Sequence, residues 1–237
     1  MTESFGSDPL QTVKVFRYDE ANNVGVIFIH GGAWRDPNNT YDDFKEFASY
    51  AEANYPSLNL FGVNYRLSPN VKHPGHLQDI SESVEYLKKT YDLTDIVLVG
   101  HSVGATLILQ YIRRTEAAEG VRISNCYLID GIFDIPELVS EYPGYASFVN
   151  EAFTSEKQYS EATDIYDARF SGIGHIYIIQ SLQDELLSER QTDLLAGYLA
   201  NTSTKFLVQK GNWGLHEEVY RRKEVFDLVL GTIGTAP

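Results

Sequence analysis

The stretch that decides the fold reads IVLVGHSVGATLILQYIRR, from Ile96 to Arg114. Its first half is an apolar run typical of a buried strand, and its second half has the pattern of a helix. Between the two halves stands Ser102, with Gly100 and Gly104 on either side. Small residues are expected there if a strand turns sharply into a helix and holds the serine hydroxyl in an exposed position. The same string also suits a plain turn, so the surrounding sequence has to decide.

Apolar runs alternate with helical patterns along most of the chain, which predicts an α/β fold with a mainly parallel sheet covered by helices. The runs VGVIFIH and HIYIIQ are almost wholly apolar, as in strands that are buried on both faces. We expect strands at 13–18, 24–30, 58–65, 96–100, 124–130, 175–180 and 205–209. We expect helices at 41–54, 77–90, 103–115, 188–201 and 217–230.

The composition predicts one α/β domain over 1–237, because the 237 residues contain no linker or repeat and 43% of them are apolar. A formal net charge of -14 argues against a nucleic-acid partner, which would require clustered Lys and Arg. The beginning, MTESFGSDPLQ, lacks the regions of a signal peptide, and no apolar run is long enough to cross a membrane. Cys126 is the single cysteine, so no intrachain disulfide can form. We therefore expect a cytoplasmic protein without a membrane partner; the oligomeric state, a homodimer included, stays open.

The stretch 132–172 is too long for a simple connection after the strand that ends near Asp130. We expect it to fold as short helices over the sheet edge, where an insertion can form a lid over a site. Its aromatic residues suit either a ligand pocket or packing within the insert, and they are Phe133, Tyr142, Tyr145, Phe148 and Phe153.

A serine nucleophile needs a base within hydrogen-bond reach and a third group that orients the base. His216 is the best candidate of six histidines, because its loop, GNWGLHEEVY, follows the last strand and opens at the same sheet edge as Ser102. His216 could instead cap the final helix. Other histidines fit less well, because they lie beside the serine, in a buried strand, or in a loop where we expect surface or capping roles: His101, His175, His73 and His76.

The orienting acid should come from another loop at this edge, between the serine and the histidine in the chain. Asp184 fits this position, and a short, firmly held carboxylate orients an imidazole well. Glu185 is its neighbour and rival, while Asp130 and Asp134 follow the preceding strand. Asp184 and Glu185 could also simply supply the negative charge that is common at a helix start.

A second motif lies in VIFIHGGAWRDP (26–37), where a buried strand runs into His30, Gly31, Gly32, Ala33 and Trp34. Fixed backbone N–H groups can hold the negative charge that develops on a carbonyl oxygen under attack. The N–H groups of Gly32 and Ala33, with that of Val103 after the serine, are therefore the expected oxyanion hole. The motif lacks the glycine spacing of a dinucleotide fingerprint and the lysine of a phosphate-binding loop.

These motifs together resemble the α/β-hydrolase superfamily: HGGAW, NYRLSP (64–69) and GHSVGA, followed by Asp184 and His216 in that order. HGGAW together with GHSVGAT, LIDGIFDIPELVSEYP and SLQDELLSERQT is similar to the small fungal kynurenine formamidases, also called arylformamidases. The resemblance covers nearly the whole chain. It implies hydrolysis of N-formyl-L-kynurenine to L-kynurenine and formate, the second step of tryptophan breakdown towards NAD. It also implies a triad of Ser102, Asp184 and His216, with Gly32 and Ala33 in the oxyanion hole.

The hypothesis is acyl transfer from a small-molecule substrate through a formyl-serine intermediate, which requires no cofactor and no metal ion. We expect Trp34 to narrow the acyl pocket, and Trp213 with Phe133 and Tyr142 of the insert to form an apolar slot for the substrate. Two alternatives stay open. One is a carboxylesterase for small esters with the same triad, and the other is a non-catalytic ligand-binding member of the fold.

Overall fold

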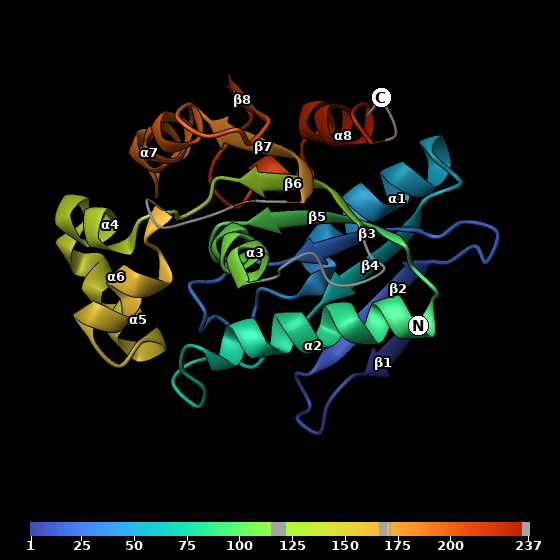
Figure 1. Ribbon diagram of the computed structural model, residues 1–237, viewed down its shortest axis with the longest axis horizontal. Coiled ribbons are helices and arrows are strands. Elements are labelled where there is room, and N and C mark those ends of the chain that lie inside the picture. Colours follow the sequence, from blue (N-terminus) through green and yellow to red (C-terminus); the bar gives the residue numbers. More distant parts are fainter. Residues whose placement is uncertain (115–121, 166–169, 171, 234–237) are drawn as a thin grey trace.

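The computed structural model describes residues 1–114, 122–165, 170 and 172–233. Within these residues the centre is an eight-stranded sheet in the order β1-β2-β4-β3-β5-β6-β7-β8 (Figure 1). Neighbouring strands are parallel from β4 to β8, whereas β2 pairs antiparallel with both β1 and β4. The strands are β1 (Thr2–Ser4), β2 (Thr12–Arg17), β3 (Val24–Ile29), β4 (Asn59–Val63), β5 (Asp95–His101), β6 (Arg122–Ile129), β7 (Ile173–Ser181) and β8 (Phe206–Gly211).

The sheet is apolar on both faces, because successive side chains of a strand point to opposite sides. On β3, for example, Ile27 and Ile29 belong to one buried core, and Val26 and Phe28 belong to the other. Helices α2, α3 and α7 complete the first core, while α1 and α8 complete the second (Figure 1). The elements that cover the sheet are η1 (Tyr41–Phe44), α1 (Lys45–Asn54), α2 (Gly75–Thr90), α3 (Val103–Arg114), α7 (Arg190–Leu199), η4 (Val219–Arg221) and α8 (Lys223–Leu230).

The segment after β6 folds into short helical pieces, namely α4 (Ile135–Glu141), η2 (Pro143–Tyr145), α5 (Ala146–Ala152) and α6 (Glu156–Ala162). Figure 1 shows α4, α5 and α6 grouped at the end of the molecule towards which the arrows of β5 and β6 point. Leu138 of α4 and Val149 of α5 are completely buried and join the first core. The insert therefore packs against the carboxyl ends of the strands, the edge where sites form in parallel sheets.

The expected mostly parallel, helix-covered sheet is confirmed, and the seven predicted strands correspond to β2 to β8. The prediction missed β1, which has only three residues with polar or charged side chains and is held by antiparallel pairing with β2. The predicted helix 41–54 begins as a 3-10 turn before it becomes α-helical. The last residue of the predicted helix 103–115 lies outside the described residues. In the part of the chain that the structure describes, no helix is both long and apolar enough to cross a membrane.

Candidate active site

Ser102 stands in a tight turn between the end of β5 and the start of α3. Its φ angle of 53° lies in the left-handed region, which a residue other than glycine occupies only under strain. Gly104 is required next to it, because an added Cβ would lie 2.2 Å from the carbonyl oxygen of Ile29. A Cβ at Gly100 would likewise lie 2.7 Å from the Gly104 carbonyl. The two glycines thus let α3 start directly against β3 and β5, and Ser102 lines a cavity at this point.

His216 is bound to Asp184, with 2.7 Å between Nδ1 of the ring and Oδ2 of the carboxylate. The side chains are almost fully enclosed, with exposed fractions of 4% for His216 and 0% for Asp184. The other oxygen, Oδ1, accepts hydrogen bonds from the N–H groups of Leu186 at 2.8 Å and Leu187 at 2.9 Å. The carboxylate is thus held at three points, and it orients the imidazole so that Nε2 is the nitrogen left for a reacting group.

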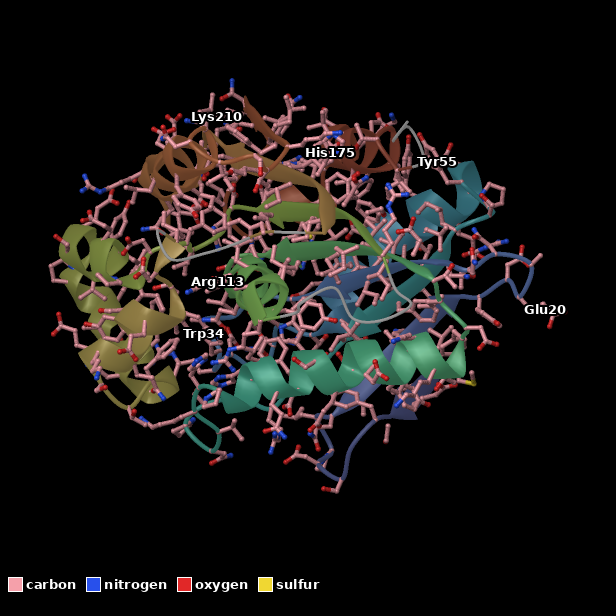
Figure 2. All side chains as sticks on the ribbon, viewed as in Figure 1. Glu20, Trp34, Tyr55, Arg113, His175 and Lys210 are labelled. Carbon is pink, nitrogen blue, oxygen red and sulfur yellow. The ribbon has the colours of Figure 1, made fainter. Side chains whose placement is uncertain are left out.

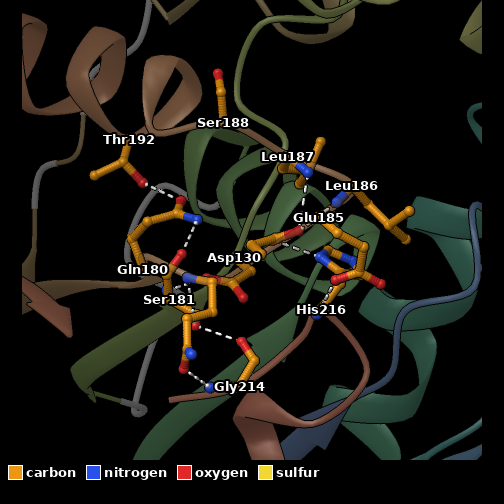
Figure 3. A network of polar contacts seen from close by, with 12 residues as sticks. Asp130, Gln180, Ser181, Glu185, Leu186, Leu187, Ser188, Thr192, Gly214 and His216 are labelled. Atoms are coloured by element: carbon orange, nitrogen blue, oxygen red, sulfur yellow. Dashed lines mark hydrogen bonds and ion pairs between the residues drawn. The ribbon is translucent and has the colours of Figure 1, made fainter. Parts of the chain in front are cut away.

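The loop that carries His216 is attached to the loop after β7 by polar contacts (Figure 3). Glu185 accepts a hydrogen bond from the N–H of His216 at 2.8 Å. The Ser181 hydroxyl donates to the carbonyl of Gly214 at 2.6 Å, and the Gly214 N–H donates to the Gln183 side chain at 3.0 Å. The two neighbouring acids therefore contact different parts of His216: Asp184 contacts the ring, and Glu185 accepts a hydrogen bond from the main chain.

Asp130, at the end of β6, is a further carboxyl group beside this pair. Its side chain is completely buried, and Oδ1 accepts a hydrogen bond from the N–H of Ser181 at 2.7 Å. One carboxylate oxygen each of Asp130 and Asp184 and one ring nitrogen of His216 lie within 4.8 Å of one another. Burial, and after it the charge of Asp184, raise the pKa of Asp130 well above its ordinary value. Asp134, the other candidate acid after this strand, is the N-cap residue of α4, where its side chain accepts a hydrogen bond from the N–H of Glu137 at 2.9 Å.

The loop after β3 has an unusual backbone. Three consecutive residues, Gly32, Ala33 and Trp34, have φ angles of 90°, 49° and 59°. Gly32 is required, because an added Cβ would lie 2.9 Å from Cβ and Oδ1 of Asn39. Among the described residues, no hydrogen bond is found from the N–H groups of Gly32 and Ala33. Val103 is the first residue of α3, a position whose N–H has no partner within a helix. Of the three residues expected to form the oxyanion hole, Gly32 and Ala33 line the cavity that Ser102 also lines.

A buried tyrosine holds this loop from behind. The Tyr65 hydroxyl lies 3.1 Å from the carbonyl oxygen of His30 and 3.0 Å from that of Gly31, and it can donate to either. The rings of Tyr65 and His30 stack with 4.4 Å between their centroids, and burial lowers the pKa of His30 to about 4. His30 is therefore neutral and structural. Tyr65 belongs to the NYRLSP motif, but its contact with the loop could not be derived from the sequence because the two lie 34 residues apart.

Three further histidines, His73, His76 and His101, are also buried, whereas His175 on β7 is half-buried. His101 lies 4.5 Å from His216 between ring centroids, and burial lowers its pKa well below the ordinary value, so it does not compete for the proton. The expectation of surface or capping roles for His73 and His76 is wrong. His73 stacks on Phe153 at 5.1 Å between ring centroids, and Nε2 of His76 lies 3.1 Å from the Ser68 hydroxyl. The insert covers the loop that holds His73, through hydrogen bonds from the His73 N–H to the Ala152 carbonyl and from the Gln158 side chain to the His73 carbonyl. His76 lies in the first turn of α2. The local sequence reveals neither arrangement.

Among the residues that the structure describes, two groups of side chains bring potential metal ligands within 4.8 Å of one another. They are His101 with His216 and Glu217, and Asp130 with Asp184 and His216. Both groups include His216, whose Nδ1 already contacts Asp184. A metal ion at either position would compete with the orientation of His216 as a base.

Ser102 and His216 open onto the same cavity, which has a volume of about 280 Å³. This volume is close to the lower end of small-molecule sites, at roughly 300 Å³. Gly32 and Ala33 also line the cavity, so the nucleophile, the base and the glycine loop share one space. Its apolar wall consists of Ile132, Tyr145, Phe148, Leu186 and Leu187, and its polar wall of Arg35, Asp36, Asn39 and Glu217.

The four side chains expected to form the substrate pocket do not line this cavity. Trp34 is inside the molecule (Figure 2) and packs against Phe148 and Phe153, with 6.1 Å and 5.4 Å between ring centroids. Its φ of 59° belongs to the turn of the glycine loop, and its ring supports the cavity wall from behind through Phe148. Phe133 is buried and borders a separate small cavity with Thr106.

Tyr142 and Trp213 do not line the cavity, for different reasons. The Tyr142 hydroxyl accepts from the N–H of Ser188 at 3.0 Å, and its ring stacks on Tyr145, which takes the place at the cavity. Trp213 packs against the second core, which α1 and α8 complete. The aromatic insert does supply the apolar wall, but through Tyr145 and Phe148 in place of the residues expected.

Known proteins resemble this chain along most of its length. A family model described as an alpha/beta hydrolase fold matches residues 26–191. Kynurenine formamidase from Meyerozyma guilliermondii is 45% identical, over 97% of this chain and 92% of its own. The protein of that name from Debaryomyces hansenii is 40% identical over 97% and 98% of the two chains, and that from Saccharomyces cerevisiae is 32% identical over 88% of each.

Solved structures share the architecture at much lower sequence identity. Esterase B from Lactobacillus Rhamnosis superposes with a TM-score of 0.77, covering 99% of this chain and 84% of its own, at 17% identity. This likeness shows the fold, and the sequence relatives show the family. The chain belongs to the kynurenine formamidase family and is a hydrolase of the α/β-hydrolase fold.

Proposed function

We propose that this protein hydrolyses N-formyl-L-kynurenine to L-kynurenine and formate, a step of tryptophan degradation. The observation that carries the proposal is the identity of 45% and 40%, over 97% of the chain, to relatives named kynurenine formamidase. The cavity supports it, because a space of about 280 Å³ beside Ser102 suits a single small aromatic molecule.

The first chemical step is attack by the Ser102 hydroxyl on the formyl carbon, with transfer of its proton to Nε2 of His216. The contact of 2.7 Å between Asp184 and Nδ1 stabilises the imidazolium that forms. The developing oxyanion lies in the hole made by the N–H groups of Gly32, Ala33 and Val103. Loss of one such donor typically costs about 100- to 1000-fold in rate.

In the second step His216 gives the proton to the departing aryl amine, and the formyl group stays on Ser102 as an ester. Water, deprotonated by His216, then releases formate and restores the serine. The formyl group carries only hydrogen beside its carbonyl, so it requires little space on the acyl side. The kynurenine ring fits against the apolar wall formed by Tyr145, Phe148 and Leu186.

The experiment follows kynurenine absorbance during hydrolysis of N-formyl-L-kynurenine by the wild type and by Ser102→Ala. We expect turnover by the wild type and a loss of at least about 10,000-fold in kcat for the variant, as for other serine nucleophiles. Ser81→Ala is the matched control, because Ser81 is exposed on α2 and does not line the cavity.

The two alternatives give different results in the same assay. A wild type that hydrolyses aryl acetates but leaves N-formyl-L-kynurenine intact would be a carboxylesterase, and the substrate assignment would be wrong. A protein that hydrolyses neither and is not labelled by a serine-directed fluorophosphonate would be a binding module.

A further inference from the structure

The polar wall of the cavity has no part in the acyl-transfer steps, yet it carries three charged side chains. Arg35 and Asp36 follow the glycine loop directly, and Glu217 follows His216. Both segments are fixed by the catalytic machinery, so these charges have a defined position relative to Ser102. Among the described residues that line the cavity, Arg35 is the one side chain with a permanent positive charge.

Arg35 is held at the rim by contacts with the insert. Its Nη1 donates to Oε1 of Glu151 on α5 at 2.9 Å, and its guanidinium lies 5.9 Å from the ring centroid of Phe148. The ion pair is 39% exposed on both sides, and such pairs contribute little to stability. A guanidinium has five N–H donors in a planar fork, so it can bind a second carboxylate while it keeps Glu151.

Glu217, which also lines the cavity, is held through one oxygen. Its Oε2 accepts from the hydroxyl of Tyr220 at 2.8 Å and from Nδ2 of Asn39 at 3.2 Å. Asn39 is itself anchored to Asp43 at 3.0 Å and also lines the cavity. No hydrogen bond of the second oxygen, Oε1, is found among the described residues, so a cationic group of the substrate could bind there.

We propose that this wall binds the α-amino acid group of the substrate, with Arg35 contacting the carboxylate and Glu217 the ammonium. The inference rests on the proposed function, because N-formyl-L-kynurenine ends in a zwitterionic α-amino acid opposite its formamide. A zwitterion is matched by one fixed charge of each sign, and Arg35 and Glu217 provide this pair in the same cavity that Ser102 lines. Arg35 and Glu217 are therefore specificity residues that distinguish an amino acid formamide from a simple formanilide.

The net charge of the whole protein gives a second argument for the role of Arg35. The protein carries a formal net charge of -14, and Asp36 and Glu217 add negative charge to the cavity itself. A carboxylate entering such a site is repelled unless a fixed cation compensates for these charges. Arg35 provides that compensation at the cavity.

Four formamides test the proposal, and all share the aryl ketone of N-formyl-L-kynurenine. The first is N-formyl-L-kynurenine, the second lacks only the carboxylate (3-amino-1-(2-formamidophenyl)propan-1-one), and the third lacks only the amine (4-(2-formamidophenyl)-4-oxobutanoate). The fourth, 1-(2-formamidophenyl)propan-1-one, lacks both groups. The measurement is kcat/KM for each compound with the wild type, Arg35→Met and Glu217→Gln.

We expect Arg35→Met to lower kcat/KM for the two substrates with a carboxylate by about 10- to 100-fold, as for loss of a charged hydrogen bond. The loss should come mainly from a higher KM, because the carboxylate is bound equally in ground and transition states. The two substrates without a carboxylate should change less than about twofold. Glu217→Gln should lower kcat/KM for the two substrates with an amine and leave kcat/KM nearly unchanged for the two without it.

Three control variants separate binding from a structural role. Glu151→Gln removes the ion pair with the insert but leaves Arg35, so it should keep the preference for the carboxylate. Arg35→Lys should restore part of this preference, because the charge remains without the fork. Arg190→Met breaks a comparable exposed pair, between Arg190 on α7 and Glu137 on α4, and should leave all four rates unchanged.

The failure of this inference differs from failure of the proposed function. If the wild type hydrolyses N-formyl-L-kynurenine and Arg35→Met slows all four substrates equally, or none, the function stands and the subsite is wrong. If Glu151→Gln reproduces the effect of Arg35→Met, Arg35 acts through the insert and not on the substrate. If the wild type does not hydrolyse N-formyl-L-kynurenine at all, the proposed function is wrong and this inference falls with it.

Discussion

At the scale of single residues, the site places the buried carboxyl of Asp130 next to Asp184. The two groups lie near one imidazole, and Asp184 receives N–H groups from Leu186, Leu187 and His216. Asp130 receives a hydrogen bond from Ser181 and has no exposed surface. Burial, and after it the charge of Asp184, raise the pKa of Asp130 to about 9, so Asp130 keeps its proton at neutral pH.

This arrangement predicts a pH dependence of stability. The unfolded chain releases the Asp130 proton above an ordinary pKa of 3.8, whereas the folded protein retains it to a higher pH. The wild type therefore loses stability as the pH rises above about 4, by up to ~1.4 kcal/mol per pH unit from this group. Asp130→Asn cannot titrate, so its stability relative to the wild type should be lowest near pH 4 and increase towards pH 8.

Urea unfolding of both proteins between pH 4 and pH 8 measures this difference. Glu20→Gln is the control for loss of one acid, because Glu20 is exposed at the outer end of a loop (Figure 2). A difference between Asp130→Asn and the wild type that does not change with pH would contradict the raised pKa.

At the scale of elements, the position of Ser102 depends on how closely α3 starts against β3. Gly104 is the contact point, since its Cα faces the carbonyl of Ile29. A backbone oxygen cannot swing away as the end of a long side chain can. The strain at Ser102 is thus imposed by the packing of a helix on two strands, and it persists because those elements are buried.

Gly104→Ala should push α3 away from β3 and displace Ser102 from the oxyanion loop. We expect the rate of fluorophosphonate labelling to fall by at least about 100-fold, because small displacements of reacting groups are that costly. The matched variant is Gly197→Ala in the interior of α7, where an added Cβ meets nothing within 4 Å. It should stabilise the protein by about 0.5–1 kcal/mol, the ordinary helix gain. Equal labelling of Gly104→Ala and the wild type would show that the close approach is not needed.

At the scale of the whole molecule, the insert is part of the main core. Leu138 and Val149 are completely buried together with residues of β5, β6 and α3. A lid that unfolds independently would need its own core, and these side chains share theirs with the sheet. The apolar wall of the cavity therefore depends on the stability of the entire domain.

Leu138→Ala should destabilise the molecule by about 2–5 kcal/mol, the usual cost of a buried leucine, and unfolding should remain a single transition. Leu207→Ala is the control, since Leu207 is 45% exposed on β8, and it should cost less than about 0.5 kcal/mol. Denaturant unfolding followed by tryptophan fluorescence and by circular dichroism tests both expectations. Non-coincident transitions for Leu138→Ala would show that the insert unfolds separately.

Much of this architecture could be predicted from the sequence because its signals are local. Apolar runs such as VGVIFIH mark buried strands wherever they occur, and β3 lies where the run predicts it. β1 has no such signal, since its three residues become a strand only by pairing with β2. Asp130 could be listed as a candidate acid, but its burial beside Asp184 depends on strands β6 and β7 lying next to each other.

The sequence by itself determined the turn around Ser102 and the glycine loop, because each depends on residues within a few positions of one another. It also gave the chain order of Asp184 and His216, but their contact joins residues 32 positions apart and belongs to the tertiary structure. Only the tertiary structure decided which side chains surround the cavity. Trp34 and Phe148 are both aromatic, yet Phe148 lines the cavity and Trp34 packs behind it. That choice follows from how α5 packs on the sheet edge, and such packing joins residues more than a hundred positions apart, as Arg35 and Glu151 do. Short-range sequence patterns carry no information about contacts between residues so far apart in the chain. The close packing of the whole core decides which of these side chains are buried.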